Sequence, residues 1–433
     1  MRSRLAPVVA VLLWCGCTSP RTPDAQPQPE EVPQAEAPGV EPQARLPTMK
    51  DAVRDGHDPN RPIRVETHAF YPDGQPLSAN RLAQLQMDEG FGVEVFARDL
   101  EHARMIAVGP DDTVYLTRPK QRDVIALRDS NGDGQADQRF TAASELDSIH
   151  GITIHEGRVY LASNRYVWRG RIEADGSFGP LEELASDLPD GGQHPNRTLA
   201  IGPDGMLYLS VGSTCNACPE PNPENATLIR AQLDMSNRAV FAHGLRNTVG
   251  FGWHPDTQEL WGMDHGTDMR GDDIPPEELN RISEGLHYGW PYVYGDREFD
   301  YVTGEPEDTS FEEFAAQTEP PVLLYQAHAA PMAMVFYRGS NFPASYQGDA
   351  FMVMRGSWNR HTPVGYKVVR LRFEDGQPQG FEDFITGFLN DDGNVHFGRL
   401  SGIALDNQGR LLFSDDENGV IYRVGYQPKA ASN

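Results

Sequence analysis

Positive charge is scarce in this sequence, which carries 37 Lys and Arg residues against 63 Asp and Glu residues. The formal net charge at pH 7 is therefore −26 over 433 residues. A surface with such an excess of carboxylates repels the phosphates of DNA and RNA, so nucleic acid is excluded as a partner. The 42 Gly and 34 Pro residues indicate many turns, which favours an all-β fold.

Long hydrophobic runs are also missing, and the one short run lies near the N-terminus. Residues 5–14 are apolar and follow two arginines, a pattern typical of an export signal. The run is too short to span a bilayer. Gly16 before Cys17 resembles the end of a bacterial lipoprotein signal, so we expect residues 1–17 to be a signal peptide and Cys17 to be lipidated. The alternative is ordinary cleavage that releases a periplasmic protein.

Large apolar side chains are almost absent from residues 18–48, which are rich in Pro, Gln, Glu and Ala. Such a segment cannot bury a core, so we expect it to be an extended, disordered tether. Residues 49–433 would then form the folded domain. The sequence thus predicts an exported protein that is either attached to a membrane through a lipid anchor alone or free in the periplasm.

Cysteine is rare as well, and only Cys215 and Cys218 lie outside the signal region. They form a Cys-x-x-Cys pair, CNAC. A structural zinc site would need a second pair, and haem attachment would need a histidine at position 219, which is proline. In an exported protein, this pair predicts a small loop disulfide.

A weak internal repeat runs through the folded part of the chain. Each copy has an apolar strand, a turn with Asp or Gly, and a second apolar strand. The copies are MIAVGPDDTVYLTR, GITIHEGRVYLAS, LAIGPDGMLYLSVG, GFGWHPDTQELWGMD, AMVFYRGSNFPASYQGDAFMVM and LSGIALDNQGRLLFSDD. The first four recur at roughly the 40–50-residue spacing of propeller blades. We therefore predict an all-β, six-bladed β-propeller; a pair of β-sandwiches is the alternative, but it does not explain the spacing. The longest interval, residues 262–331, predicts an elaborate loop over one face.

Two clusters of polar residues precede strands of this repeat. His194 stands in GGQHPNRTLAIGPDGMLYLSVG, in the loop before a strand–turn–strand hairpin, where a rigid sheet can present it. Arg246 and Asn247 stand in HGLRNTVGFGWHP, also directly before a strand. Both clusters should therefore project from the same face, although a lone histidine or arginine can equally serve only its own loop. Arginine offers a planar fork of donors, and asparagine both donates and accepts.

Two acidic segments are candidate calcium sites. The segment MDHGTDMRGDDIPPEELNRISEGLHYGWPYVYGD supplies carboxylates and exposed backbone carbonyls, the ligands that Ca²⁺ prefers, and its alternative interpretation is a solvated acidic loop. In DSNGDGQAD, Asp129, Asn131, Asp133 and Asp137 have the spacing of EF-hand ligands, but Phe140 replaces the glutamate at the twelfth position. A plain turn between strands is the alternative there.

Cations are few enough in this acidic chain for a local group of them to be informative. Arg360 and Lys367 fall in GSWNRHTPVGYKVVRL, and Arg355 directly precedes this segment. Arg399 falls in FGRLSGIALD. Their position near the ends of predicted blade strands indicates an anionic ligand in the mouth of the propeller.

Taken together, these motifs resemble the glucose/sorbosone dehydrogenase family, six-bladed quinoprotein propellers that use pyrroloquinoline quinone (PQQ) and Ca²⁺. The resemblance covers roughly residues 91–424. It rests on the order of the His194 segment, GLRNTVGFGWHP, DHGT…DD…EELN, GLHYGWP and GRLSGIALDNQGRLLFSDDENGVIYRV. The CNAC pair and GSWNRHTPVGYKVVRL look closest to the sorbosone-dehydrogenase-like branch.

The resemblance implies roles for particular residues. It places His194 as the catalytic base, Arg246 and Asn247 against quinone and substrate, and His150 and Arg399 against the quinone. The carbonyls of Gly266 and Thr267 would hold the calcium ion. The sequence departs from the family at Gln193, in place of an acidic neighbour, and at Ser401, in place of a second cofactor-binding arginine. The family's fifth-blade lysine has no clear equivalent, and Arg355 is the cation assigned to the cofactor there.

The resemblance therefore implies a PQQ-dependent dehydrogenase that oxidises an aldose or a related sugar or aldehyde by hydride transfer, and that passes electrons to an external acceptor. A neutral imidazole suits the base, because its ordinary pKa of about 6.5 lies near working pH. Two alternatives remain open from the sequence. One is a non-catalytic propeller that binds a partner or a glycan, and the other is a metal-dependent lactone hydrolase.

Overall fold

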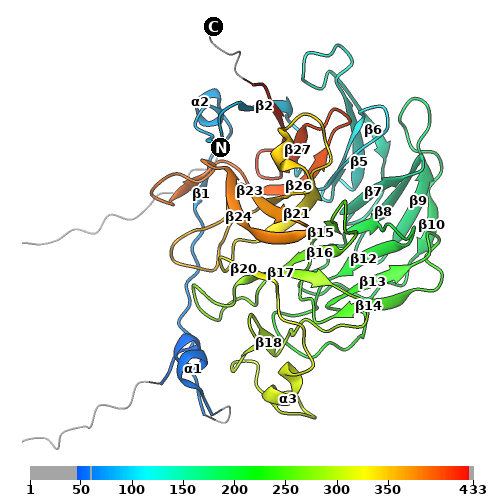
Figure 1. Ribbon diagram of the computed structural model, residues 1–433. Coiled ribbons are helices and arrows are strands. Elements are labelled where there is room, and N and C mark those ends of the chain that lie inside the picture. The colour runs from blue at the N-terminus through cyan, green and yellow to red at the C-terminus, as the bar shows by residue number, and fades with distance from the viewer. Residues whose placement is uncertain (1–45, 59–60, 429–433) are drawn as a thin grey trace, which may run out of the picture. The chain divides into compact units, whose positions relative to one another are not determined.

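The protein forms six four-stranded antiparallel sheets that follow one another around a ring (Figure 1). The computed structural model describes residues 46–58 and 61–428. In order, the blades are β3 (Ile106–Val108), β4 (Val114–Arg118), β5 (Asp123–Arg128) and β6 (Gln138–Ala143); β7 (Gly151–His155), β8 (Arg158–Ala162), β9 (Val167–Arg171) and β10 (Glu182–Ala185); β11 (Leu199–Ile201), β12 (Leu207–Val211), β13 (Thr227–Ala231) and β14 (Ala239–His243); β15 (Gly250–Trp253), β16 (Leu260–Asp264), β17 (Glu277–Ile282) and β20 (Leu323–Tyr325); β21 (Pro331–Phe336), β22 (Ala350–Met354), β23 (Lys367–Glu374) and β24 (Gln377–Ile385); and β26 (Leu400–Leu405), β27 (Leu411–Asp415), β28 (Val420–Tyr426) and β2 (Phe91–Ala97).

The six sequence repeats correspond to the first two strands of the six blades, which confirms the predicted six-bladed propeller. The hairpin β11–β12 shows why the repeat folds this way. Its turn residue Asp204 accepts a hydrogen bond from the Met206 N–H at 3.1 Å, and Gly205 has a φ of +74°, a left-handed conformation that favours glycine. The apolar side chains of the two strands then point alternately toward the blade on one side and the blade on the other.

The ring is closed by strand β2, which comes from the N-terminal part of the domain and pairs with β28 from its end. Phe91 of β2 packs edge-to-face against Phe342, Phe384 and Tyr426, with ring centroids 4.9, 5.1 and 5.0 Å away. Because Phe342 and Phe384 belong to the β21–β24 blade, β2 fastens the last blade to its neighbour.

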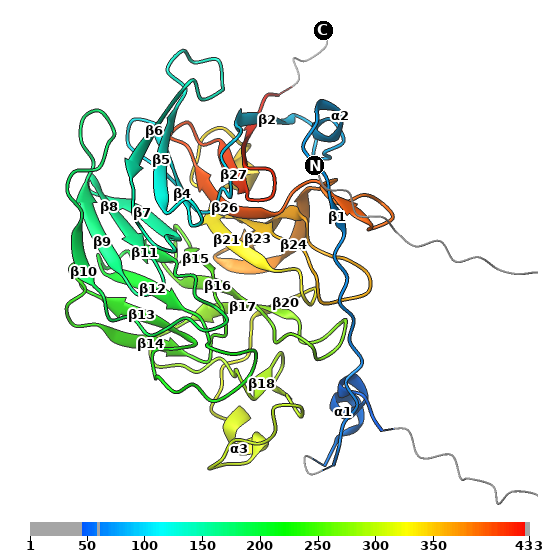
Figure 2. The ribbon, with the colours of Figure 1, turned by 180° about the vertical axis from the view of Figure 1, so that it is seen from behind.

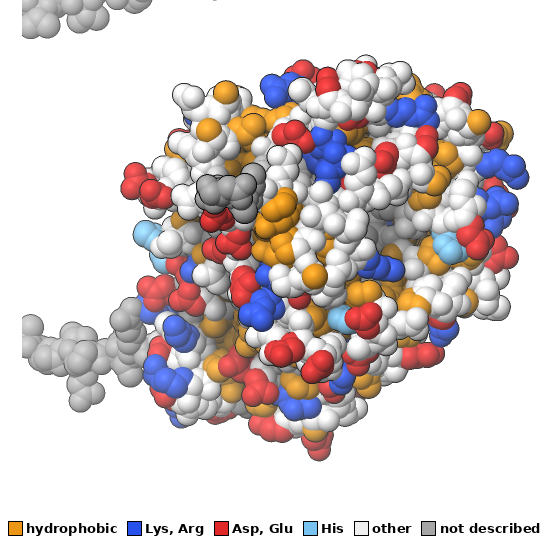
Figure 3. Space-filling model, turned by 45° about the horizontal axis from the view of Figure 1, so that its top comes forward, with side chains coloured by type: hydrophobic (Ala, Val, Ile, Leu, Met, Phe, Trp, Pro, Cys, Tyr) orange, Lys and Arg blue, Asp and Glu red, His pale blue; other side chains and the backbone are white. Residues whose placement is uncertain are grey.

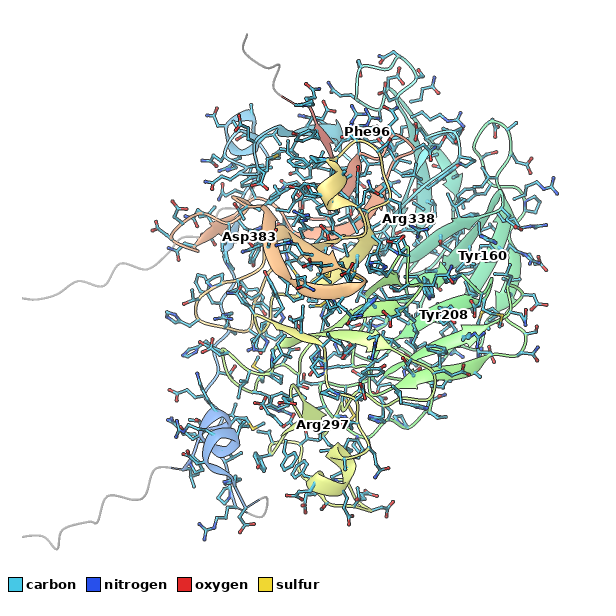
Figure 4. All side chains as sticks on the ribbon, viewed as in Figure 1. Phe96, Tyr160, Tyr208, Arg297, Arg338 and Asp383 are labelled. Carbon is cyan, nitrogen blue, oxygen red and sulfur yellow. A yellow bond between two sulfur atoms is a disulfide. The ribbon has the colours of Figure 1, made fainter. Side chains whose placement is uncertain are left out.

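Apolar side chains fill the space between adjacent blades. Tyr160 of β8 packs in one cluster with Leu199 and Leu209 of the next blade, and these side chains are at most 2% exposed. Figure 4 shows Tyr160 and Tyr208 on these two neighbouring blades. The first strands of the blades contact one another around the axis, from β11 and β7 through β3 and β26 to β21 and β15.

The remaining elements lie outside the blades. They are α1 (Met49–Asp55), α2 (Ala79–Leu82), α3 (Phe311–Ala315), the 3₁₀ turn η1 (Ala344–Tyr346), the parallel pair β1 (Asp73–Gly74) and β25 (Val395–His396), and the pair β18 (Val293–Tyr294) and β19 (Glu298–Phe299). The pair β18–β19 and helix α3 belong to the long insertion before β20, which lies at the lower edge of the propeller in Figures 1 and 2. It matches the predicted elaborate loop.

The surface mixes charges of both signs. On the face shown in Figure 3, acidic and basic side chains are interspersed, without a continuous basic patch. In the part of the chain that the structure describes, no helix has the length and apolar character needed to cross a membrane. The predicted signal peptide, Cys17 and nearly all of the predicted tether lie outside the described residues.

Candidate active site

Several segments that precede a first strand carry charged or polar side chains, and they meet at one end of the propeller. In an antiparallel sheet, the start of the first strand lies at the same end as the end of the second strand. Since the first strands surround the axis, the residues just before them gather around it. These residues are Arg104 before β3, His150 before β7, His194 before β11, Arg246 and Asn247 before β15, and Arg399 before β26.

His194 is held by the loop that follows β12. Its Nδ1 lies 2.8 Å from Ser213 Oγ and 3.1 Å from the Ser213 carbonyl oxygen. The Ser213 hydroxyl donates its own hydrogen to the Cys215 carbonyl at 2.7 Å, so both Ser213 oxygens must accept from the imidazole. Nδ1 therefore carries the ring hydrogen. Nε2 has no hydrogen-bond partner among the described residues, which leaves its lone pair free, as a general base requires.

The surroundings of His194 keep the ring neutral. Burial lowers the pKa of the imidazole to about 2, and the charges of Arg246 and His265 act in the same direction. From the sequence alone, the ordinary imidazole pKa of about 6.5 is expected. The structure differs because the ring is enclosed by its loop and has a buried guanidinium beside it. The imidazole is thus an unprotonated base over the whole neutral range.

We expect turnover by the active protein to be insensitive to protonation of His194 between about pH 5 and pH 8. Protonation removes the lone pair of Nε2, and a pKa of about 2 moves that loss to strongly acidic solution. The pH profile of kcat measures this. An acidic limb of kcat centred near pH 6.5, the ordinary imidazole pKa, would contradict this description of the His194 environment.

Arg246 is almost fully buried, with 2% of its surface exposed. Its Nη2 donates to Asn216 Oδ1 at 2.8 Å and to Asp268 Oδ2 at 3.0 Å, and its Nε donates to the Asn216 carbonyl at 3.0 Å. Nη1 makes only a 3.5 Å contact with the His265 carbonyl. One edge of the guanidinium is therefore fixed by the protein, and Nη1 retains hydrogen-bonding capacity.

Asn247 lies beside His194, with Gly212 between them. A Cβ on Gly212 would lie 2.6 Å from the Cβ of His194 and 3.1 Å from Oδ1 of Asn247, so only glycine leaves room for both. The backbone N–H of Asn247 donates to Asp264 at 2.8 Å, but its side-chain amide makes no hydrogen bond among the described residues. That amide is therefore available to a ligand next to the imidazole.

Gly266 and Thr267 lie near the start of the loop between β16 (ending at Asp264) and β17. The Gly266 N–H donates to Glu277 at 2.8 Å, and Glu277 also accepts from the Ala330 N–H at 2.8 Å. Burial raises the pKa of the Glu277 carboxyl to about 8. The carbonyl oxygens of Gly266 and Thr267 accept no hydrogen bond among the described residues. Unpaired backbone carbonyls are oxygen ligands of the kind that calcium takes.

The second candidate calcium loop lies elsewhere, between β5 and β6. There Asp129 accepts hydrogen bonds from the N–H groups of Gly132 and Gly134 at 2.8 Å each, and Asp137 accepts from the Ser130 N–H at 2.9 Å. These carboxylates stabilise the turn itself, in keeping with the hairpin interpretation. Calcium binding by this loop stays an open alternative.

Two arginines from different blades share one oxygen of Asp416. Arg104 Nη1 lies 2.7 Å and Arg355 Nη1 lies 2.6 Å from Asp416 Oδ2, and Ser401 Oγ donates to the same oxygen at 3.2 Å. Burial opposes ionisation of Asp416, but Arg355 and Arg104 outweigh it and lower the pKa of the carboxyl to about 2. The carboxylate is therefore ionised and has two guanidinium partners.

Arg399 adds a third guanidinium and is poorly paired. Its Nη2 makes a long hydrogen bond of 3.4 Å to the Gly356 carbonyl, its Nε is buried without a hydrogen-bond partner among the described residues, and the guanidinium lies 5.9 Å from the centre of the Tyr366 ring. Burial lowers the pKa of Arg399, and the charge of Arg355 adds to this effect. We call Arg104, Arg355 and Arg399 the arginine cluster. Its three positive charges outnumber the carboxylates in contact with it.

His150 lies behind the arginine cluster and is fully buried. Its Nδ1 donates to the Arg197 carbonyl at 3.0 Å, so Nε2 accepts from Arg104 Nη2 at 3.2 Å. Burial, and then the charge of Arg104, lowers the pKa of His150 to about 3. Both ring nitrogens are used within the protein, so His150 positions Arg104; direct contact between His150 and a cofactor stays a prediction.

The other predicted residues have partners of their own. Arg360 pairs with Asp273 at 3.1 Å and Lys367 pairs with Asp383 at 2.7 Å, so of the four predicted cations only Arg355 and Arg399 come together. Figure 4 labels Asp383 on the outer strand of its blade, away from the axis. Cys215 and Cys218 form a disulfide in the β12–β13 loop.

Sequence reasoning missed Arg104, Asp416 and Ser213. Arg104 precedes Ser401 by 297 residues, and no motif connects the two. Each missed residue nevertheless has an equivalent place in the repeat: Arg104 comes just before a first strand, and Ser213 and Asp416 come just after a second strand. Comparing the same positions across all six repeats could have found them.

Comparison with known proteins identifies the family of this chain. The profile of the TrAA12-like family matches residues 85–427. The chain belongs to this family. An uncharacterized protein of Borreliella burgdorferi is 30% identical over 387 residues, which cover 85% of this chain and 98% of that protein. The pyrroloquinoline quinone-dependent sugar dehydrogenase of Hypocrea jecorina is 25% identical over 285 residues, which cover 53% of this chain and 62% of the fungal protein.

Solved structures of TrAA12-like proteins and their relatives share the propeller. The calcium structure of a Trichoderma reesei enzyme of carbohydrate-active family AA12 has a TM-score of 0.68 at 19% identity, covering 85% of this chain and 100% of that one. The holo PQQ domain of Coprinopsis cinerea pyranose dehydrogenase has a TM-score of 0.67 at 20% identity, covering 79% and 97%. The predicted relation to PQQ-dependent sugar dehydrogenases is thereby confirmed, and the narrower resemblance to the sorbosone-dehydrogenase-like branch stays a prediction.

Proposed function

We propose that this TrAA12-like protein oxidises an aldose or a related sugar or aldehyde, with PQQ as the hydride acceptor and His194 as the general base. One observation carries the proposal: a neutral imidazole with a free Nε2 and an arginine cluster with excess positive charge occupy the same end of the propeller. The names of the fungal relatives, a PQQ-dependent sugar dehydrogenase and the PQQ domain of a pyranose dehydrogenase, support this assignment.

The arginine cluster fits a quinone that carries carboxylates. Arg104 and Arg355 share one carboxylate, that of Asp416, and the third guanidinium, Arg399, has a buried Nε without a hydrogen-bond partner among the described residues. Buried charges are normally paired, so an anionic ligand would satisfy this group. Arg104 reaches Ser401 Oγ at 3.3 Å, so an arginine from another blade compensates for the one that the family resemblance leads us to expect at position 401.

The chain's own residues would perform the proton chemistry. When bound, PQQ supplies a two-electron hydride acceptor, which an external electron acceptor regenerates. His194 Nε2 takes the proton of the anomeric hydroxyl while the hydrogen on the same carbon leaves as hydride, so an aldose becomes a lactone. Asn247 orients the hydroxyl beside the imidazole, and Arg246 Nη1 stabilises negative charge that develops near it.

Calcium would bind at the carbonyl oxygens of Gly266 and Thr267, which have no hydrogen-bond partners among the described residues. A divalent cation there would act as a Lewis acid toward an oxygen of the bound quinone. The Asp268 carboxylate lies on the same loop and pairs with Arg246 at 3.0 Å, which holds the loop beside these two carbonyls.

Adding PQQ and Ca²⁺ to the apoprotein should produce sugar oxidation in a dye-linked assay. Omitting PQQ should abolish the reaction, and a chelator should abolish it until calcium is restored, because both groups complete the site. The assay should be run over a panel of aldoses and aldehydes beside a lactone-cleavage assay.

Each other outcome of that experiment points to a different function. Lactone cleavage without PQQ would favour a metal-dependent lactone hydrolase. An absence of turnover together with an absence of PQQ binding would favour a propeller that binds a partner or a glycan. Activity that survives exhaustive chelation, with no metal detected in the protein, would remove calcium from the proposal.

We also propose that the protein is exported and is either anchored through Cys17 or released into the periplasm. The proposal rests on the apolar run and the Gly16–Cys17 pair in the first 17 residues. An exported site would be accessible to sugars and to an external electron acceptor.

A further inference from the structure

The loop closed by the Cys215–Cys218 disulfide contacts the surroundings of both His194 and Arg246. On one side, Ser213 accepts from the imidazole Nδ1 and donates to the Cys215 carbonyl at 2.7 Å. The N–H of Ser213 also donates to the Arg246 carbonyl at 2.8 Å. A short segment of the β12–β13 connection is therefore bonded to both residues, which come from different blades.

Asn216, inside the disulfide loop, makes the contacts on the other side. Its Oδ1 accepts from Arg246 Nη2 at 2.8 Å and from the Asp268 N–H at 2.9 Å, and its Nδ2 donates to the Asp268 carbonyl at 2.8 Å. Its backbone carbonyl accepts from Arg246 Nε at 3.0 Å and from Trp290 Nε1 at 3.2 Å. One residue thus joins the segment before β15, the β16–β17 loop and the long insertion.

The chemistry of these contacts requires an amide at position 216. The side chain binds both the N–H and the carbonyl of Asp268, which needs one acceptor and one donor, while the same oxygen receives a guanidinium hydrogen. A carboxylate could accept but could not donate, and a hydroxyl is too short to span both groups. Because Asp268 directly follows Gly266 and Thr267, these hydrogen bonds fix the position of the two unpaired carbonyls.

We propose that Asn216 is a positioning residue, which the Cys215–Cys218 disulfide holds in place so that it aligns Arg246 and the 266–268 loop with His194. This inference rests on the proposed function for the roles of Arg246 and the 266–268 loop. The disulfide limits the freedom of the loop, so Asn216 keeps one position without help from a ligand.

Three variants test the proposal. Asn216→Ala removes every side-chain contact, whereas Asn216→Asp keeps an acceptor for Arg246 and replaces the donor to Asp268 by a charged oxygen. The matched control is Asn222→Ala on the same loop, where Oδ1 accepts only from the Glu224 N–H at 2.9 Å. Ca²⁺ binding to the apoprotein is measured by calorimetry, and kcat and KM are measured after reconstitution.

We expect Asn216→Ala to weaken Ca²⁺ binding and to lower kcat by roughly 10- to 100-fold each, the loss typical of hydrogen bonds to charged groups, with a smaller change in KM. Asn216→Asp should weaken Ca²⁺ binding, because the carboxylate repels the Asp268 carbonyl, while losing less kcat than the alanine variant because it keeps the Arg246 contact. Asn222→Ala should leave both quantities unchanged.

Reducing the disulfide tests its part in the proposal. A dithiol reductant transfers two electrons and two protons to Cys215 and Cys218, giving two thiols and the oxidised reductant. The reduced wild-type protein should show the weakened Ca²⁺ binding of Asn216→Ala, and reduction of that variant should add little further loss. Full Ca²⁺ affinity in the reduced wild type would overturn the role of the disulfide.

The readouts separate this inference from the proposed function. If the reconstituted wild type oxidises no sugar, the proposed function fails, and the calorimetric comparison still tests the position of the 266–268 loop. If Asn216→Ala has normal Ca²⁺ affinity and normal kcat and shows only a lower melting temperature, Asn216 is a structural residue and the inference is overturned.

Discussion

Replacing His194 by alanine is expected to lower kcat by roughly 10²- to 10⁴-fold, the loss typical of removing a general base. Nε2 is the ring atom with a free lone pair, whereas the nearby His265 uses its Nε2 to donate to the Pro331 carbonyl at 2.6 Å. PQQ affinity and melting temperature should change little, because the imidazole makes its hydrogen bonds only to Ser213. Steady-state kinetics with PQQ and Ca²⁺ in excess provides the measurement.

The control for this variant is His287→Ala. The pKa of His287 is also lowered, to about 4, by burial, but its Nδ1 accepts only from the Gly289 N–H at 3.0 Å, in the insertion after β17. Loss of a second enclosed imidazole outside the site should therefore leave kcat within a few-fold of wild type. Normal turnover by His194→Ala with PQQ bound would remove this histidine from the mechanism.

Replacing Arg399 by methionine is expected to weaken PQQ binding by roughly 10- to 100-fold without loss of stability. The guanidinium has one long hydrogen bond of 3.4 Å and a buried Nε without a partner among the described residues, so the apoprotein gains little from it. Methionine is unbranched and fills a similar space. Titration of apoprotein with PQQ, monitored by absorbance or calorimetry, gives the affinity, and thermal unfolding gives the stability.

The matched control is Arg370→Met on β23 of the preceding blade. Arg370 pairs with Asp349, which is 2% exposed, and lies over the Tyr346 ring, so its loss leaves a buried carboxylate unpaired. This variant should lose stability while keeping PQQ affinity, the opposite of Arg399→Met. If Arg399→Met binds PQQ as the wild type does, or if it is the less stable of the two variants, the assignment of the arginine cluster to the cofactor is wrong.

The architecture was predictable because each blade repeats a local pattern. Alternating apolar residues around an Asp- or Gly-containing turn are read directly from the sequence, and six copies define six blades. The closing strand β2 was harder to predict, because its pairing with β28 joins residues from opposite ends of the domain. The aromatic rings that Phe91 contacts belong to another blade, so the sequence around Phe91 does not indicate that β2 closes the ring.

The composition of the site was only partly predictable, because its electrostatics depend on contacts across the ring. His194, Arg246 and Asn247 were found from motifs close to strands. Arg104 was not, since its partners Ser401 and Asp416 lie 297 and 312 residues further along the chain. The lowered pKa of His194 was missed for the same reason: burial and Arg246 cause it, and neither can be read from the neighbouring sequence.

We propose that sugar oxidation takes place at the end of the propeller that carries both His194 and the arginine cluster. A single-turnover experiment tests it most directly: protein loaded with PQQ and Ca²⁺ is mixed anaerobically with an aldose in the absence of any external acceptor, while the absorbance of the bound quinone is followed. We predict stoichiometric conversion of the quinone to its reduced form in the wild type, and a conversion slowed by roughly 10²- to 10⁴-fold in His194→Ala. Reduction at the same rate in both proteins would contradict the role of His194, and no reduction by any aldose or aldehyde in the loaded wild type would contradict sugar oxidation at this site.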